Sequence, residues 1–380
     1  MKKIKRPDRL LWAVARFFLR RFAKKVNLKV YDTVSGKLKP PFIVLVNHAS
    51  VQDYKIDCYV LRKLRPNHVG AYNQFVGKAR LLRRLGAIPK RQFVADVSLV
   101  KQIKGVLNRK GVFVIYPEAA ISIGGGNRSI YPNIAKLVKL LNTPVAVINI
   151  KGSYISKPRW KETQRKTDRV EAHFYPLFTE TNQMSVEEVL DGIKTALHHN
   201  VWEWQKEAGV KNYSQDFLDD AENILYQCPT CLTEFKMHGE GNTITCGECG
   251  RKWTIDAYGQ FDDGGNIAKW VDFQSEVIRK QLPEYNFSVD VTLETLDDFK
   301  GYKQCGEGTL TQTAEGVRYK GTDGTELFFS AEKTPTCGLS PRHVEFSAAD
   351  NTYKFVMKEV NAAAKVCLGV IETANYNGNL

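Results

Sequence analysis

The chain has 380 residues, 43% of them hydrophobic and 25% charged, and its formal net charge is +14. This composition is ordinary for a soluble globular protein, and the length is sufficient for two or three domains with a sizeable core. No run of 18 or more uncharged apolar residues occurs, so the sequence predicts no helix that spans a bilayer.

The first 25 residues carry most of the excess positive charge. They contain ten lysines or arginines against one acid, Asp8, and no small-residue cleavage site follows their apolar part, so we expect no cleaved signal peptide. Residues 10–26 are predicted to form a basic amphipathic helix. Such a helix lies in a membrane interface among anionic lipids, or packs on a core with a solvated basic face. The predicted apolar face comprises Leu11, Val14, Ala15, Phe18 and Phe22.

The main candidate for a chemical site is a histidine that follows a buried-looking strand. Residues 41–46 are predicted as the strand, and residues 54–64 as a helix. His48 and Asp53, five residues apart, can meet only if His48 precedes the helix and Asp53 lies in its first turn. Asp53 would then fix the imidazole tautomer and leave the other nitrogen as a general base. The alternative is a capping box from Ser50 to Asp53, with the carboxylate on backbone amides.

Three further segments follow the histidine. In chain order the four are Asn47, His48 and Asp53 in the pattern NHxxxxD, then residues 86–91, then Tyr116-Pro117-Glu118, and then Pro144 in an apolar strand. The chain resembles the glycerophospholipid acyltransferases related to 1-acylglycerol-3-phosphate acyltransferase, over about residues 10–205. This resemblance implies an α/β acyltransferase domain with a mostly parallel sheet and flanking helices.

The resemblance also implies a reaction and roles for named residues. A fatty acyl group would pass from acyl-coenzyme A or an acyl-carrier protein to the hydroxyl of a lysophospholipid at a membrane surface. His48 would be the general base, oriented by Asp53. Arg91 and Lys90 would hold the acceptor phosphate, and Glu118 would contact its polar head.

The chain departs from the family pattern in two places. The second segment is one residue shorter, and residues 119–121 are Ala-Ala-Ile where the family usually has Gly-Thr-Arg. An arginine that binds phosphate is therefore missing. Arg91 with Lys90 would carry that role alone, or Arg128 would substitute for the missing arginine. The same departure leaves open a non-catalytic scaffold on this fold that binds lipid or nucleic acid.

Two Cys-x-x-Cys pairs separated by 14 residues predict a zinc ribbon with four ligands: Cys228, Cys231, Cys246 and Cys249. Four thiolates leave no open coordination position, so the metal would be structural. Zinc is favoured over iron because nothing else indicates electron transfer. The other cysteines are predicted as buried thiols in a reducing compartment: Cys58, Cys305, Cys337 and Cys367.

The remaining N-terminal half alternates between helices and strands. Predicted elements are a helix at 96–108, a strand at 111–115, a helix at 134–141, a strand at 144–150 and a long helix from Ser185 to about Ala208. His198 and His199 on the last helix are predicted as surface residues. Open α/β sheets place their sites beyond the carboxyl ends of strands, which is where His48 and Glu118 would lie.

From about residue 287 the sequence changes to short alternating segments and turn residues, closed by a helix at 362–374. This pattern resembles pleckstrin-homology or GRAM-like modules. The predicted division is an amphipathic membrane-interface helix at 1–30, an acyltransferase domain at 31–222, a zinc ribbon at 223–256, a helical linker at 257–286 and a β-rich domain at 287–380.

The predicted partners and location follow from these features. The cations gather on an apolar, aromatic helix rather than in the ribbon, which favours anionic lipid over nucleic acid. We therefore expect a cytoplasmic protein that is peripheral on the inner face of a membrane and acts on a lysophospholipid, with an acyl-carrier protein as a further partner if it is the donor.

Overall fold

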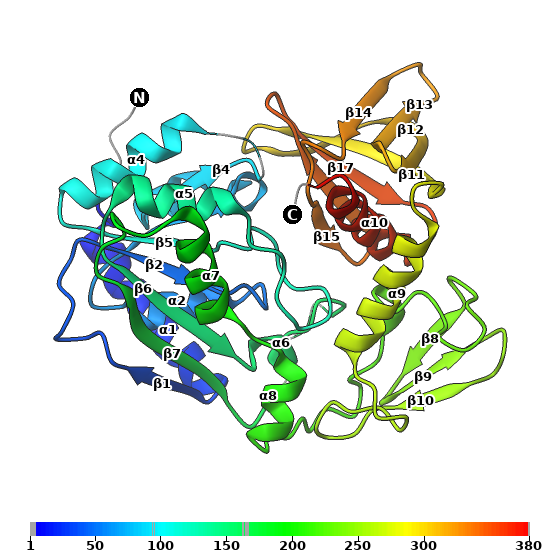
Figure 1. The fold of residues 1–380 in the computed structure, drawn as a ribbon, viewed down its shortest axis with the longest axis horizontal. Helices are drawn as coiled ribbons and strands as arrows, with labels where there is room; N and C mark the ends of the chain where they lie inside the picture. Colours follow the sequence, from blue (N-terminus) through cyan, green and yellow to red (C-terminus); the bar gives the residue numbers. More distant parts are fainter. Residues whose placement is uncertain (1–4, 93, 95, 162, 164–166, 379–380) are drawn as a thin grey trace.

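The computed structural model describes residues 5–378 except 93, 95, 162 and 164–166; Lys2 and Lys3 of the basic start lie outside this set. The chain forms three parts that lie side by side in Figure 1. We call them the α/β region (residues 9–207), the cysteine region (residues 221–254) and the β-rich region (residues 286–376). This mixed architecture agrees with the predicted fold class.

The α/β region is built on one seven-stranded sheet. Its strands are β1 (Leu28–Asp32), β2 (Phe42–Val46), β3 (Asn67–Ala71), β4 (Ala87–Lys90), β5 (Val112–Ile115), β6 (Val145–Lys151) and β7 (Val170–Phe178). Their order is β1-β7-β6-β2-β5-β3-β4, and only the β6–β7 pair is antiparallel. Every residue of β2 and β5 is buried, because helices cover both faces of this mostly parallel sheet.

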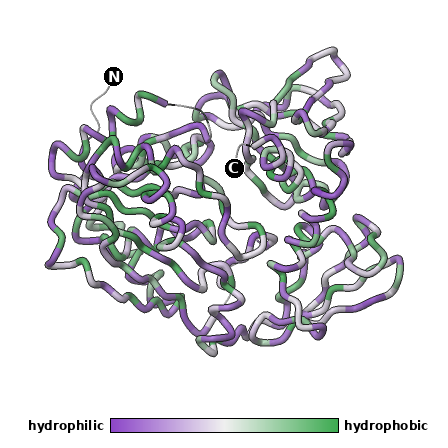
Figure 2. The backbone as a smooth tube through the Cα atoms, viewed as in Figure 1, coloured by the Kyte–Doolittle hydropathy of each residue, from purple (hydrophilic) through white to green (hydrophobic). Residues whose placement is uncertain are grey.

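Helices cover the sheet on two sides and create two separate apolar cores. They are α1 (Arg9–Lys25), α2 (Asp53–Val60), η1 (Tyr72–Phe75), α3 (Ala79–Arg84), α4 (Val97–Asn108), α5 (Pro132–Leu141), α6 (Ser153–Ser156), α7 (Val186–Leu197) and α8 (Val201–Glu207). One core packs α4, α5 and α7 against the sheet, and the other packs α2 and the end of α1 against the opposite face. Figure 2 shows hydrophobic residues along the central strands between these layers.

Helix α1 packs on the core, which is one of the two alternatives that the sequence left open; its place in a membrane interface stays a prediction. Trp12 and Leu19 are buried against the rest of the α/β region, and Trp12 Nε1 donates a hydrogen bond to the Arg62 carbonyl at 2.9 Å. The other side of the helix nevertheless exposes a set of apolar side chains: Leu10, Val14, Phe17 and Phe18, which are 56–80% exposed. The predicted face was therefore partly wrong, because Leu11, Ala15 and Phe22 are half-buried.

The long helix predicted from Ser185 is two helices. Ser185 begins α7 with the predicted capping box, but α7 ends at Leu197, and Asn200 caps α8 by accepting hydrogen bonds from the first backbone amides of that helix. His199, predicted on the surface, lies in the break and is only 5% exposed. The break occurs because the His199 amide donates to Asn127 Oδ1 at 2.6 Å instead of continuing the helix.

The cysteine region is a small antiparallel sheet that follows the short helix η2 (Ala221–Asn223). Its strands are β8 (Met237–Glu240), β9 (Thr243–Cys246) and β10 (Lys252–Thr254), in the order β10-β9-β8. Gly241 has φ of 62° in the β8–β9 turn, a conformation that favours glycine. Helix α9 (Ile267–Gln281) then runs from this region to the β-rich region, within the helical linker predicted at residues 257–286.

The β-rich region is a second seven-stranded sheet with one closing helix. Its elements are β11 (Asn286–Asp297), β12 (Gly301–Thr313), β13 (Gly316–Gly321), β14 (Glu326–Ser330), β15 (Gly338–Ser340), β16 (His343–Ser347), β17 (Thr352–Met357) and α10 (Ala362–Tyr376). The strand order is β14-β13-β12-β11-β17-β16-β15, entirely antiparallel. Neighbours in this order are also consecutive in the chain, with the exception of the β11–β17 pair. The consecutive pairs agree with the predicted short alternating segments joined by turns.

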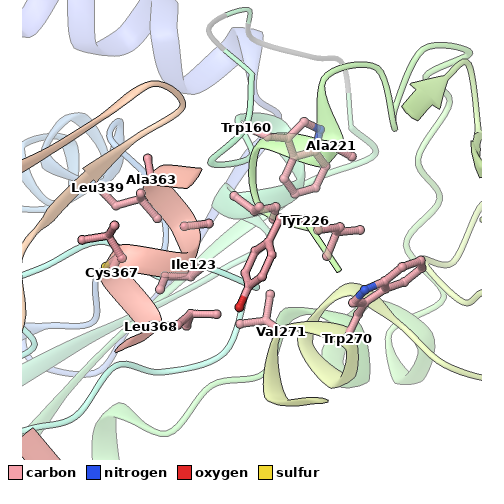
Figure 3. Packing of buried hydrophobic residues seen from close by; sticks show 14 of the residues in the cluster. Ile123, Trp160, Ala221, Tyr226, Trp270, Val271, Leu339, Ala363, Cys367 and Leu368 are labelled. Atoms are coloured by element: carbon pink, nitrogen blue, oxygen red, sulfur yellow. The ribbon is translucent and has the colours of Figure 1, made fainter. Parts of the chain in front are cut away.

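A single cluster of buried residues connects all three parts. Figure 3 shows Ile123 of the α/β region near Val271 of α9 and Leu368 of α10. Burying one large aliphatic side chain stabilises a fold by roughly 1.5–3 kcal/mol, so a shared core of this kind holds the parts together. Cys337 and Cys367 are buried in this cluster as free thiols, as predicted, whereas the prediction is wrong for Cys305, which lies in an exposed stretch of β12, residues 303–305.

Candidate active site and metal centre

The sheet register brings the two motif-bearing turns to one edge. Leu45 of β2 pairs with Ile115 of β5, and His48 and Glu118 each lie three residues beyond these partners. Asn47 fixes the first turn to β6, because its side-chain amide donates to the Ile150 carbonyl at 2.9 Å and its Oδ1 accepts from the Ile150 amide at 2.7 Å. The sequence order of the motifs is thereby converted into spatial proximity.

His48 and Asp53 are in direct contact. His48 Nδ1 lies 3.1 Å from Asp53 Oδ2; the Asp53 side chain is fully buried and the His48 side chain is 21% exposed. No described residue forms a hydrogen bond with His48 Nε2. With Asp53 ionised, Nδ1 carries the proton and Nε2 has a free lone pair. This is the arrangement that a general base requires.

One of the two contacts of the predicted capping box is present at the same carboxylate. Asp53 Oδ2 accepts from the Ser50 amide at 2.7 Å, whereas the Ser50 hydroxyl donates to the Lys157 carbonyl at 3.0 Å and does not cap α2. The helix instead begins at Asp53 without a side-chain cap. One oxygen therefore serves both the turn and the imidazole, and the backbone amide holds it in place for His48.

Glu118 holds the two turns together. It is 1% exposed, and its two carboxylate oxygens accept from the backbone amides of His48 at 3.0 Å and Arg128 at 2.8 Å. Burial raises the pKa of Glu118, and these two hydrogen bonds oppose that rise. The contact with an acceptor headgroup predicted from the sequence stays untested, and in this structure Glu118 positions the backbone of His48.

A second histidine–aspartate pair lies behind the first. The Tyr116 ring packs against the His48 ring with 4.4 Å between centroids and 41° between planes, and its hydroxyl donates to Asp57 Oδ2. Asp57 is fully buried, and its Oδ1 lies 2.8 Å from His68 Nε2. Burial, and next the Asp57 charge, raise the pKa of Tyr116 well above its usual value, so the hydroxyl stays a donor. Sequence reasoning missed this network; the signal was that Asp57 lies one helical turn after Asp53.

The donor atoms of Asp57, Cys58 and His68 lie within 4.8 Å of one another and could hold a metal. The imidazole already has two partners in this group, because Cys58 Sγ is 3.6 Å from the same His68 Nε2. Burial raises the pKa of Cys58 well above its usual value, which keeps the thiol protonated. Hydrogen bonding is therefore a sufficient account of this group.

The second motif lies on β4 and the turn after it, which the sequence did not identify as a strand. Lys90 Nζ donates to the carbonyls of Arg91 and Val94 at 3.0 and 2.9 Å, and burial lowers its pKa. Arg91 lies with its guanidinium carbon 4.7 Å from the centre of the Tyr72 ring, and no described carboxylate is within ion-pair distance of it. Of the two predicted phosphate ligands, Lys90 is engaged by backbone carbonyls, whereas the charge of Arg91 is not paired with any described carboxylate.

Arg128 is placed away from any open site. It is 9% exposed; its guanidinium donates to Thr336 Oγ1 and lies 3.7 and 3.8 Å from Cys367 Sγ. Thr336 lies between β14 and β15, and Cys367 lies in α10. The structure therefore uses Arg128 to join the α/β and β-rich regions, and the alternative of Arg128 as the substitute phosphate ligand loses its basis.

The four predicted metal ligands converge. The Sγ atoms of Cys228 and Cys249 are 3.8 Å apart, those of Cys231 and Cys246 are 3.7 Å apart, and all four lie within 4.8 Å of one another. The amide of Thr230 donates to Cys228 Sγ at 3.4 Å, a contact that stabilises a thiolate. Four thiol donors at these separations fit a tetrahedral zinc ion.

Comparisons with known proteins give structural similarity without a sequence match. No protein-family profile matches the chain, and no curated protein sequence matches it. Among solved structures the chain is similar to the 1-acyl-sn-glycerophosphate acyltransferase of Thermotoga maritima, with 18% sequence identity and a TM-score of 0.42. The match covers 50% of this chain and 79% of that chain. Similarity at this level does not assign the chain to a family.

Among the described residues, no helix is both long and apolar enough to cross a membrane.

Proposed function

We propose that the protein is an O-acyltransferase that moves a fatty acyl group from a thioester donor to the hydroxyl of a lysophospholipid. The observation that carries this proposal is the His48–Asp53 pair, in which Asp53 takes Nδ1 and leaves Nε2 without a hydrogen bond from any described residue. The NHxxxxD pattern and the order of the later motifs support the reaction class.

In the proposed mechanism, His48 Nε2 removes the proton of the acceptor hydroxyl while its oxygen attacks the thioester carbonyl. The buried carboxylate of Asp53 stabilises the imidazolium that forms. When the carbon–sulfur bond breaks, the imidazolium returns its proton to the departing thiolate. The products are the acylated lipid and a free thiol, and no covalent intermediate on the enzyme is needed.

The proposed acceptor is a lysophospholipid such as 1-acylglycerol-3-phosphate. Arg91 would bind its phosphate, because this guanidinium has no described carboxylate partner. Gln92, the next residue, donates to the Ala119 carbonyl at 2.7 Å, so Arg91 is tied to the turn that carries Glu118. Lys90 would support the turn rather than touch the lipid.

We further propose that α1 holds the protein on a membrane surface that contains anionic lipid. Its exposed apolar set projects from a helix that also exposes Arg20, Arg21, Lys24 and Lys25. An apolar stripe bordered by cations suits the lipid–water interface. This placement corresponds to a peripheral protein on the cytoplasmic face.

The four cysteines would hold one zinc ion with a structural role. A set of four thiolates has no coordination position for substrate, so zinc would stabilise the region between α8 and α9 and take no part in acyl transfer. We expect one equivalent of zinc per chain in protein purified without chelator. Replacing Cys246 by serine should lower both the zinc content and the unfolding temperature.

The experiment that tests the reaction is acyl transfer on liposomes that contain lysophospholipids with different headgroups, with acyl-coenzyme A and acyl-carrier protein as alternative donors. Product that is lost in His48→Ala would support the proposal. Absence of product with every pair, from folded and zinc-loaded protein, would contradict it and favour a lipid-binding scaffold.

A further inference from the structure

A turn of the β-rich region packs against η1, which lies beside the second motif. Between β11 and β12, the Phe299 ring stacks on the Tyr72 ring of η1 with 4.5 Å between centroids and 24° between planes. The Phe299 carbonyl accepts from the Gly77 amide at 2.8 Å. These contacts enclose η1, a turn of four residues without a side-chain cap.

Polar contacts to the β-rich region also hold η1, at its neighbouring residues Tyr72 and Asn73. The Tyr72 hydroxyl donates to Asp298 Oδ1 at 2.6 Å, and Asn73 Nδ2 donates to Glu345 Oε2. Burial, followed by the hydrogen bond to Asp298, raises the pKa of Tyr72, so this hydroxyl is a donor across the neutral range. Glu345 is in turn held by the Tyr302 hydroxyl at 2.7 Å.

Arg91 of the second motif contacts the same tyrosine. Its guanidinium carbon lies 4.7 Å from the centre of the Tyr72 ring, so the tyrosine contacts the arginine as well as Phe299 and Asp298. A guanidinium over an aromatic ring is attracted to it and keeps its N–H groups available at the edge for a planar or tetrahedral anion. The tyrosine thus transmits the position of the β11–β12 turn to Arg91.

We infer that the β11–β12 turn is part of the acceptor-binding site, in which Asp298 and Phe299 are positioning residues that hold Tyr72, and Tyr72 holds Arg91 for the phosphate of the lysophospholipid. This inference rests on the proposed function. It explains why a chain that lacks the phosphate-binding arginine of the third motif has an extra region against its second motif: the remaining arginine is held in place from outside the α/β region.

The charges around Arg91 are compatible with an anion that enters from solvent. The guanidinium carbon of Arg83 lies 5.0 Å from the centre of the Phe299 ring, so a second cation lies beside the β11–β12 turn. Two acids lie near Arg91. Asp298 is held by the Tyr72 hydroxyl, and the pKa of Asp350 is held below its usual value by the Tyr353 hydroxyl first and by Arg91 to a smaller extent. Neither carboxylate forms a described ion pair with Arg91, which leaves the guanidinium for the ligand.

The test compares acceptors with and without phosphate. For Phe299→Ala and Asp298→Asn, we expect KM for 1-acylglycerol-3-phosphate to rise about tenfold while kcat changes less than about twofold, because Arg91 contributes binding rather than chemistry. With monoacylglycerol, which has no phosphate, kcat/KM should change less than about twofold. Equal losses on both acceptors, or unchanged KM, would overturn the inference.

Two controls separate positioning from general damage. Phe328→Ala removes an aromatic of the same sheet that is 47% exposed and should leave both acceptors unaffected. In an Arg91→Gln background, Phe299→Ala should add no further rise in KM, because both changes remove the same interaction. A full additional rise in that background would mean that Phe299 acts on something other than Arg91.

Equilibrium binding of 1-acylglycerol-3-phosphate without a donor keeps this test independent of turnover. Weaker binding by Phe299→Ala supports the inference even if no acyl transfer is found, a result that would contradict only the proposed function. Wild-type protein that binds the phosphorylated and unphosphorylated lipid equally well would overturn the inference itself.

Discussion

Helix α2 carries two buried aspartates one turn apart, and each holds a histidine, yet the two pairs are not equivalent. Asp53 contacts His48 at Nδ1, 3.1 Å away, and leaves Nε2 free of described partners. Asp57 contacts His68 at Nε2, 2.8 Å away, and Cys58 lies against the same nitrogen. Both pairs leave one ring nitrogen without a described hydrogen bond. They differ in that the carboxylate meets Nδ1 of His48 but Nε2 of His68, that Cys58 also lies against His68, and that the His48 side chain is 21% exposed whereas the His68 side chain is 13% exposed.

Tyr116 connects the two pairs. Its ring covers His48 and its hydroxyl ends on Asp57, so the second pair fixes the wall of the site in which the first would react. We therefore expect the first pair to affect the chemical step directly and the second to affect it through the position of Tyr116. The following predictions test this difference.

The largest contrast is between the two histidines. His48→Ala should lower kcat by about 100-fold or more, because general-base catalysis contributes at least this much. His68→Gln keeps a donor toward Asp57 and should change kcat by less than about threefold. Steady-state acyl transfer measures both. Comparable losses in the two variants would mean that the comparison between the pairs is wrong.

The two aspartates should differ in the same direction. Asp53→Asn should lower kcat by roughly 10- to 100-fold, because the neutral amide neither selects the Nδ1–H tautomer nor stabilises the imidazolium. KM for the acceptor should stay nearly constant, since Asp53 is buried and touches no substrate. Circular dichroism of the variant serves as the control for folding. A rise in KM with constant kcat would contradict the orienting role.

A smaller effect is expected at Tyr116. Tyr116→Phe removes the hydroxyl that donates to Asp57 and should lower kcat about three- to tenfold, through a looser wall beside His48. Asp57→Asn should have a similar effect, and the double variant should be no worse than either single variant, because both remove one connection. Additive losses would show that Asp57 acts by a separate route.

The difference between the pairs also marks how far the sequence could be interpreted. His48 and Asp53 are close in the chain, so the turn geometry followed from helix periodicity and the strand before it. The four cysteines were predicted for the same reason, since each pair is local. His68 and Tyr116 meet Asp57 only after β3 and β5 pair in the sheet, and no spacing rule indicates that pairing.

Contacts between parts of the chain were the least predictable. Arg128 looked like a free cation in the sequence, but packing of α10 and Thr336 against it removed it from solvent. The contact of Phe299 was equally unpredictable, because this ring stacks on Tyr72, which lies far away in the sequence. Such contacts depend on how whole sheets pack, which local propensity does not determine.

His199 provides a third histidine environment, one without a carboxylate. Its Nε2 is buried without a described partner, and burial, with Lys151 and His198 nearby, lowers its pKa from 6.5 to about 3. Between these values the unfolded chain binds a proton that the folded chain refuses. Stability from this residue is therefore fully present above pH 6.5 and is lost as pH falls toward 3, by about 1.4 kcal/mol per pH unit.

Replacing His199 by glutamine should accordingly flatten the pH dependence of the unfolding free energy between about pH 6.5 and 4, even if the variant is less stable at neutral pH. Urea unfolding at several pH values measures this slope, and His198→Gln is the matched control: this exposed neighbour is the smallest of the three causes that lower the pKa of His199, so the variant should keep nearly the wild-type slope. An unchanged slope in His199→Gln would mean that the folded protein accepts a proton there. In that case burial without a carboxylate would not keep an imidazole neutral in this fold. His48 and His199 would then differ only in the geometry of their surroundings.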